Sequence, residues 1–161
     1  MALLAIAAAL VAPRMVSFFR GRALELEAQR LLALTHYGQS RAVAEGVPVL
    51  LWLNPKDSTY GLSLQSGYVE NDDRASSFTL DSSLTLEAPV PANQSASELQ
   101  DEKFGLPEGL PVIRFNPDGF FDEISQQKIV LRQGDEAALQ LVPTANRFGY
   151  EIQPYHADTS H

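Results

Sequence analysis

Few residues of this sequence have the types and spacing that chemistry on a substrate requires. The three histidines are His36, within a helix-like pattern, and His156 and His161, in the C-terminal tail. A catalytic triad or a histidine metal site needs such side chains to converge, and this distribution does not indicate convergence. The absence of cysteine excludes disulfides and thiolate ligands. The sequence therefore predicts no catalytic residue, no cofactor site and no metal site.

Two polar motifs remain as candidates. The cluster ENDD (70–73) offers the oxygen ligands that Ca²⁺ prefers, but it lacks the spacing of a dedicated calcium loop. Charged clusters between strands commonly lie in solvated loops, so we expect a solvated turn there. The segment NPDG (116–119) has Pro second and Gly fourth, as a type I turn prefers, and is also expected to be a turn.

Charge is distributed unevenly along the chain. The formal net charge is −8. Residues 14–45 contain five arginines against three glutamates, a net charge of +2, whereas from Gly46 onward seven basic residues face seventeen acidic ones, a net charge of −10. Nucleic-acid binding needs clustered Lys and Arg, so this acidic head argues against nucleic acid as a partner.

The first element that the sequence predicts is a long helix. Residues 14–46 follow the 3.6-residue period, and Gly46 followed by Pro48 predicts the helix end. One apolar stripe is expected to pack on the head and consists of Leu24, Ala28, Leu31, Leu32, Thr35 and Ala42. The polar residues expected mostly off that stripe are Glu25, Glu27, Gln29, Arg30 and Arg41.

Beyond the helix the hydrophobic period changes to two. Short β-type runs, separated by turn signals, occupy residues 47–53, 60–65, 77–80, 83–87, 111–115, 128–132, 138–142 and 148–152. They predict antiparallel sheets, arranged as a small sandwich with the helix covering one sheet. The fold class is therefore α+β, with a long N-terminal helix packed on a β-rich head over 47–152.

Two segments interrupt or follow this pattern. Residues 88–111 form a long stretch rich in Pro, Ser and acidic residues, either a plain exposed or disordered loop or a partner contact. As contact residues we single out Ser97, Glu98, Asp101 and Phe104. The tail 153–161 is polar and is expected to be frayed.

The chain opens with twelve uncharged residues followed by Pro13. As a helix they cover about 18 Å, less than the roughly 30 Å of a bilayer core. A secretory signal peptide would begin with positive charge, which this run lacks, and a buried core helix is the plainest alternative. We favour a fourth interpretation, in which residues 1–13 are the C-terminal half of a longer apolar helix.

Two motifs carry a family resemblance, SRAVAEGVPVLLWLNP (40–55) and GLPVIRFNPDGFF (109–121). With the apolar run and the long helix, they resemble minor pseudopilins of type II secretion, of the GspH type, and the related FimT-type minor pilins of type IV pili. The resemblance implies a pilin-like fold and a structural subunit without enzymatic activity. The basic leader and the cleavage and methylation motif of that family are not found in this sequence, so we expect its start to be internal.

The resemblance also implies how such a subunit works. It would be held in the bacterial inner membrane by a single-pass helix, with its head in the periplasm. Assembly would move that helix from lipid into a bundle near the filament tip, with other pseudopilins as partners and the outer-membrane secretin or an exported protein as further candidates. The packing residues would be Leu3, Leu4, Ile6, Leu10, Val11 and Pro13. A FimT-like minor pilin, and a non-assembling exported binding module, are the alternatives.

Overall fold

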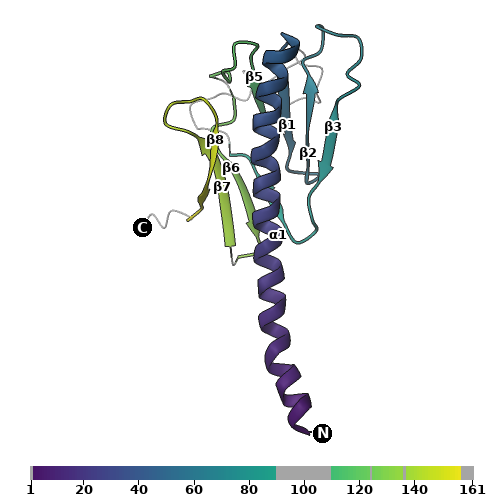
Figure 1. The fold of residues 1–161 in the computed structure, drawn as a ribbon, viewed down its shortest axis with the longest axis vertical. Coiled ribbons are helices and arrows are strands. Elements are labelled where there is room, and N and C mark those ends of the chain that lie inside the picture. Colours follow the sequence, from purple (N-terminus) through teal and green to yellow (C-terminus); the bar gives the residue numbers. More distant parts are fainter. Residues whose placement is uncertain (1, 90–109, 124, 136, 157–161) are drawn as a thin grey trace.

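One long helix organises the molecule. The computed structural model describes residues 2–89, 110–123, 125–135 and 137–156, and of residues 2–20 it describes the backbone alone. Helix α1 spans Ala2–Glu45, 44 residues, and continues through Pro13 without a break. At 1.5 Å per residue it is about 66 Å long. Its first part, residues 2–20, projects from the head and is called the stem below (Figure 1).

The helix ends where the sequence predicts. Gly46 adopts a positive φ of 68°, a conformation that glycine enters without steric penalty. Its N–H donates a hydrogen bond to the carbonyl of Ala42 at 3.0 Å, which satisfies one of the last helical carbonyls. Pro48 then leads into the first strand.

Eight strands form two antiparallel sheets of four strands each. Sheet A has the order β3-β2-β1-β5, with bounds Ser76–Thr79, Thr59–Leu64, Val49–Asn54 and Val112–Phe115. Sheet B has the order β4-β6-β7-β8, with bounds Thr85–Glu87, Ile129–Gln133, Ala137–Pro143 and Tyr150–Pro154. Each strand end lies within two residues of the bound expected from the sequence. The period-two pattern therefore located every described strand.

The chain passes between the sheets three times. It leaves sheet A after β3, enters sheet B at β4, returns to sheet A at β5 and then completes sheet B with β6, β7 and β8. Neither sheet is built from consecutive strands alone, so the two sheets fold together around shared contacts.

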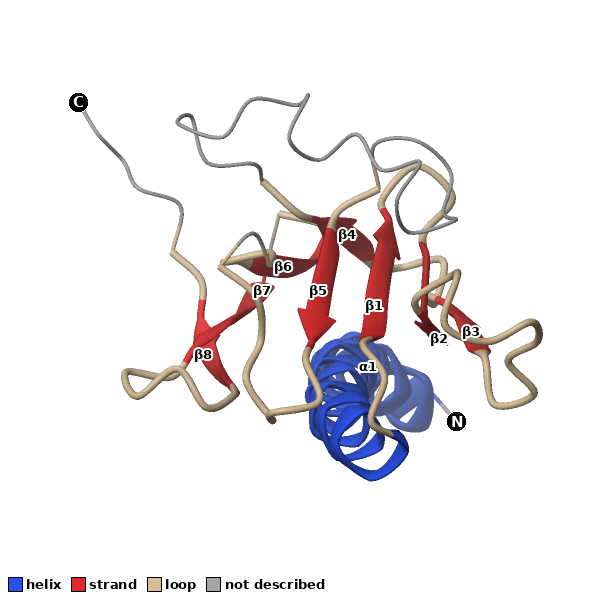
Figure 2. Ribbon diagram, turned by 90° about the horizontal axis from the view of Figure 1, so that it is seen from above, coloured by secondary structure: helices blue, strands red, loops and turns tan. Residues whose placement is uncertain are grey.

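Helix α1 packs against both sheets, which corrects the expectation that it covers only one. It contacts β1 and β5 of sheet A, and β6, β7 and β8 of sheet B. Figure 2 shows strands of both sheets on the same side of the helix. Fully buried side chains such as Leu31 of α1, Leu51 of sheet A and Leu131 of sheet B share one core. An apolar stripe shows which helix face is buried but does not show which strands cover it.

Candidate assembly surface

The C-terminal half of α1 carries the face that packs on the head. Of the six residues in the expected stripe, five are buried and one is partly buried: Leu24, Ala28, Leu31, Thr35 and Ala42 in the first group, Leu32 in the second. The Thr35 hydroxyl donates a hydrogen bond to the carbonyl of Leu32 at 2.7 Å, so this buried polar group has a hydrogen-bond partner. From Leu24 onward the helix is part of the core of the head.

Two charged residues that the sequence places off the stripe are also buried. Glu27 is 6% and Arg41 is 4% exposed. The Tyr60 hydroxyl donates a hydrogen bond to Glu27, and Arg30 Nη1 pairs with Glu27 Oε2 at 3.2 Å. Burial, together with this carboxylate acceptor, raises the pKa of Tyr60. The stripe rule misses such residues because it counts apolar types, whereas a buried charge is tolerated when it is paired.

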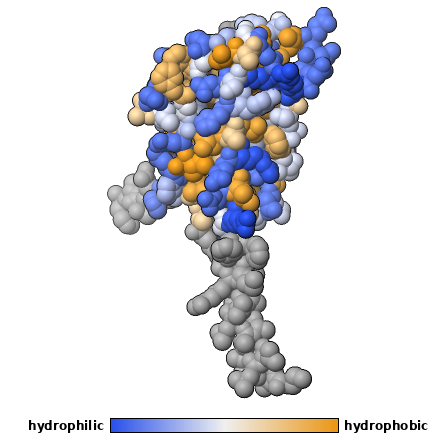
Figure 3. Space-filling view, in the orientation of Figure 1, coloured by the Kyte–Doolittle hydropathy of each residue, from blue (hydrophilic) through white to orange (hydrophobic). Residues whose placement is uncertain are grey.

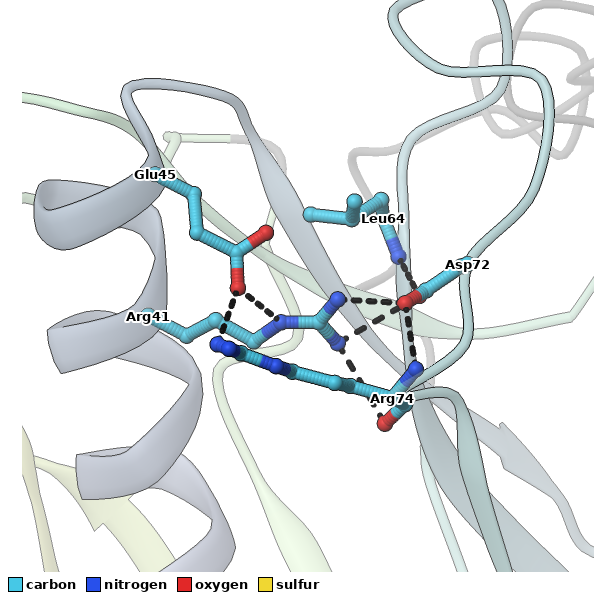
Figure 4. Close-up of polar contacts among 5 residues, drawn as sticks. All are labelled: Arg41, Glu45, Leu64, Asp72 and Arg74. Carbon is cyan, nitrogen blue, oxygen red and sulfur yellow. Dashed lines mark hydrogen bonds and ion pairs between the residues drawn. The ribbon is translucent and has the colours of Figure 1, made fainter.

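Arg41 is the centre of a polar cluster at the end of α1 (Figure 4). Its Nε donates to Glu45 Oε1 at 2.8 Å, and its two terminal nitrogens donate to both carboxylate oxygens of Asp72. Asp72 also accepts backbone N–H bonds from Leu64 at 2.6 Å and Arg74 at 3.1 Å. Arg74 Nη1 pairs with Glu45 at 3.2 Å. The cluster therefore fastens the β2–β3 connection to the last turns of α1.

This cluster changes the expectation for the acidic motif 70–73. Glu70 and Asp73 are exposed, as a solvated turn requires, but the side chain of Asp72 is only 12% exposed. Burial acts to raise the pKa of Asp72, while the bonds from Arg41, Leu64 and Arg74 lower it, and the net direction is below its ordinary value. Asp72 is a structural anion whose oxygens are engaged by donors of the chain.

The NPDG motif is a turn with a structural support. Gly119 N–H donates to the carbonyl of Asn116 at 3.0 Å, which closes the expected β-turn. Arg114, on β5, holds the turn by donating to Asn116 Oδ1 at 2.6 Å and to Asp122 Oδ2 at 3.1 Å. The residues that carry the family resemblance therefore build the scaffold of the head.

A small aromatic surface lies at two turns that are both hydrogen-bonded to α1. Phe120 and Phe148 are 44% and 54% exposed, and their ring centroids are 4.9 Å apart. Gln39 of α1 donates to the carbonyl of Gly119, next to Phe120, at 2.5 Å and to the carbonyl of Phe148 at 2.8 Å. Gln39 could not be identified from residue patterns, because its acceptors are 80 and 109 residues away.

An apolar groove opens at the base of the head, where α1 leaves it. Its volume is about 420 Å³, within the range of binding pockets. The apolar lining includes Gly21, Leu24, Ala137, Leu139 and Ile152, and Glu25 adds a carboxylate. Figure 3 shows hydrophobic surface gathered low on the head, beside the helix and close to the stem.

Several expected site residues lie outside the described part of the chain. The side chains of Leu3, Leu4, Ile6, Leu10, Val11 and Pro13 belong to the stem, of which the structure describes the backbone alone. The candidate contact residues Ser97, Glu98, Asp101 and Phe104 also lie outside the described residues. Within the residues that are described, no three His, Asp or Glu side chains form a group that could hold a metal ion.

The sequence matches the family described as Type II transport protein GspH over residues 27–146. The chain belongs to the GspH family. The match confirms the resemblance drawn from the two sequence motifs, and it includes α1 from Glu27 onward, all of sheet A and every strand of sheet B except β8. GspH-family proteins are structural pseudopilins of type II secretion, a family that interacts with other pseudopilins and is not a family of enzymes.

The fold of this chain is similar to that of solved structures. Two structures of the minor pseudopilin EpsH from the type II secretion system of Vibrio cholerae match with TM-scores of 0.54 and 0.52. The first shares 16% identity and covers 85% of this chain and 98% of EpsH; the second shares 12% and covers 81% and 96%. The likeness confirms the predicted fold class. No curated protein sequence was found to match.

One further property of α1 concerns the membrane. Among the described residues of this GspH-family chain, no helix has both the length and the apolar character that crossing a bilayer requires.

Proposed function

We propose that this chain assembles into a type II secretion pseudopilus near its tip, through packing of its stem, and thereby contributes to protein export. The observation that carries the proposal is the division of α1. From Leu24 one face of the helix is buried against the head, and the same helix continues without interruption into a projecting stem (Figure 1). A subunit built in this way presents a helix to its neighbours and keeps its head outside the bundle.

The sequence of the stem suits helix packing. Its first residues carry no charge and consist mostly of large aliphatic residues and alanines. In lipid and in helix bundles, association depends on van der Waals contact, and small residues allow backbones to approach closely. The residues proposed to make these contacts are Leu3, Leu4, Ile6, Leu10, Val11 and Pro13.

Before assembly the subunit would reside in the inner membrane with its acidic head in the periplasm. Assembly then exchanges lipid contacts of the stem for helix contacts, and no covalent bond of a substrate is broken. The head would meet other pseudopilins, and the secretin or exported protein are further candidate contacts. Its net charge of −10 from Gly46 onward argues against nucleic acid as a ligand.

A charge placed in the stem tests the proposal. Leu4→Asp, introduced into the gene in cells with the secretion system, should remove the subunit from sheared pseudopili and reduce export. The reason is that an aspartate within an apolar helix bundle or bilayer costs about 2.5–3.5 kcal/mol.

The matched control is Ala33→Asp, which places the same charge at an exposed position of α1 beside the head. This variant should assemble normally, and fluorescence of Trp52, the single tryptophan, should show a folded head in both proteins. Incorporation of Leu4→Asp at the wild-type level would refute assembly through the stem.

A further inference from the structure

The groove at the base of the head exposes part of the core-facing side of sheet B. Leu139 of β7 lies opposite Leu131, and Ile152 of β8 lies opposite Leu141; both partners are fully buried. Directly opposed residues share one face of a sheet, so Leu139 and Ile152 point to the core side. Both are nevertheless only partly buried, and Ala137, on the same face, is exposed. The apolar face of sheet B therefore extends beyond the part that α1 covers.

We propose that this groove receives the stem helix of a neighbouring pseudopilin subunit. The inference rests on the proposed function, in which stems pack side by side. It adds the place on the head where the stem of a neighbouring subunit ends. Gly21 and Leu24 line the groove and belong to the helix that forms the stem. A second helix that packs along the stem toward the head therefore runs directly into the groove.

The size of the lining residues fits a helix as the occupant. Gly21 and Ala137 present almost no side chain, and nothing lies within 4 Å of the position that a Cβ on Gly21 would take. Small residues at such a surface allow the backbone of a second helix to come close. Leu24, Leu139 and Ile152 then offer aliphatic contacts to the large side chains of the incoming stem.

Charge favours a stem over the head of another subunit. Glu25 contributes the carboxylate of the groove lining and is exposed. A stem with the pattern of this chain is uncharged over twelve residues and then carries Arg14, so it offers apolar side chains to the groove and a cation to Glu25. The head, with a net charge of −10, would instead be repelled by this carboxylate.

Photo-crosslinking in cells that assemble the pseudopilus tests the occupant. A photoreactive phenylalanine analogue replaces Ala137 in the full chain, and the same analogue at Thr79, an exposed position on the edge strand of sheet A, serves as the control. We expect an adduct from position 137 whose attached peptide comes from the uncharged N-terminal helix of a pseudopilin, and no such adduct from position 79. An adduct that maps to a pseudopilin head, an exported protein or a lipid would overturn the proposal.

Two substitutions test whether the groove is needed. Ala137→Trp fills it, and Glu25→Arg reverses its charge; each should lower incorporation into pseudopili by roughly tenfold. Thr79→Trp, on sheet A, and Glu151→Arg, on the face of β8 opposite to the groove-lining Ile152, are both at exposed positions and should incorporate at the wild-type level. Circular dichroism of each purified full chain identifies any variant whose head is unfolded, since the two tryptophan variants would confuse the Trp52 fluorescence signal. If Ala137→Trp does not fold, the result with Glu25→Arg, at an exposed position of α1, decides the test.

The outcomes separate this inference from the proposed function. If Leu4→Asp blocks incorporation while folded Ala137→Trp and Glu25→Arg incorporate normally, stems pack together but the groove does not receive them. If Leu4→Asp itself incorporates normally, the proposed function fails, and the groove proposal fails with it.

Discussion

Two largely buried carboxylates link α1 to sheet A, one through β2 and the other through the β2–β3 connection. Glu27 accepts a hydrogen bond from the hydroxyl of Tyr60 on β2, and Asp72 accepts hydrogen bonds from two nitrogens of Arg41. In both contacts one partner lies on the helix and the other lies more than thirty residues away. Each contact leaves a buried charged group if its partner is removed, so each is suited to a test by single substitution.

Asp72→Asn should lower the free energy of unfolding by about 2 kcal/mol, because the buried guanidinium of Arg41 loses its anionic partner while Glu45 remains. Urea unfolding of the full chain, followed by Trp52 fluorescence, measures the change. Asp73→Asn is the control, since Asp73 is exposed. Equal stabilities of these two variants would contradict the assigned role of Asp72.

The difference in stability between wild type and Asp72→Asn should depend on pH. The pKa of Asp72 lies below its ordinary value of 3.8, since the bonds from Arg41 and two backbone amides outweigh the effect of burial. A carboxyl whose pKa is lower in the folded state stabilises the fold above its unfolded pKa and loses that contribution as the pH falls through the folded value. The difference between wild type and Asp72→Asn should therefore be constant from about pH 7 to about pH 5 and shrink below about pH 4. An undiminished difference at about pH 3 would argue against this origin.

Tyr60→Phe removes the hydroxyl that donates to Glu27 and should destabilise the head by about 1–2 kcal/mol. Phenylalanine preserves the stacked contact with Phe78, whose ring centroid lies 5.6 Å away, so the loss reports the hydrogen bond. Differential scanning calorimetry of the full chain measures it. The control is Tyr68→Phe at an exposed tyrosine, and an equal effect of both substitutions would contradict the prediction.

At the scale of elements, the sequence predicts which segments are helical or extended, and it does not predict how they combine. Period and turn residues are local properties, so the strands and the end of α1 at Gly46 follow from them. The division into two sheets depends on pairing between distant segments such as β1 and β5. The contacts of Glu27, Gln39 and Arg41 depend on the same tertiary arrangement, which explains why residue patterns alone placed them incorrectly or missed them.

The approach of α1 to sheet A is set by a glycine. A Cβ on Gly38 would lie 2.9 Å from the ring of Phe115 and 3.1 Å from Leu62. Gly38→Ala should therefore destabilise the protein by about 1–3 kcal/mol, although alanine raises helix propensity.

Gly21→Ala is the matched substitution on the same helix. No atom lies within 4 Å of its added methyl group, so helix propensity alone should act and stabilise the protein by up to about 1 kcal/mol. Thermal unfolding followed by circular dichroism measures both variants. Stabilisation by both substitutions would contradict the prediction, because it would show that the contacts around Gly38 adjust to a methyl group without a loss of stability.

At the scale of the whole molecule, Gln39 connects α1 to two turns of different sheets. The turn with Gly119 follows β5 of sheet A, and the turn with Phe148 joins β7 to β8 of sheet B. One amide group thus links three separate parts of the fold at the end of the head distant from the stem (Figure 1).

Gln39→Ala should loosen both turns together. Removing two hydrogen bonds should lower stability by roughly 1–2 kcal/mol and raise amide hydrogen exchange in residues 116–121 and 144–149. Hydrogen exchange at β6, away from these turns, should change less and serves as an internal control. Faster exchange in only one of the two turns would contradict a shared link through Gln39.

The continuity of α1 has a mechanical consequence. Because the stem and the part of α1 that packs on the head are one helix, a pulling force on the stem reaches the head along the helix axis. From Leu24 to Ala42 the buried face is about 27 Å long, and it touches strands of both sheets. Such a force acts as shear on all of these contacts at once. Pulling α1 out of the head along its axis is therefore far harder than peeling α1 away from one end.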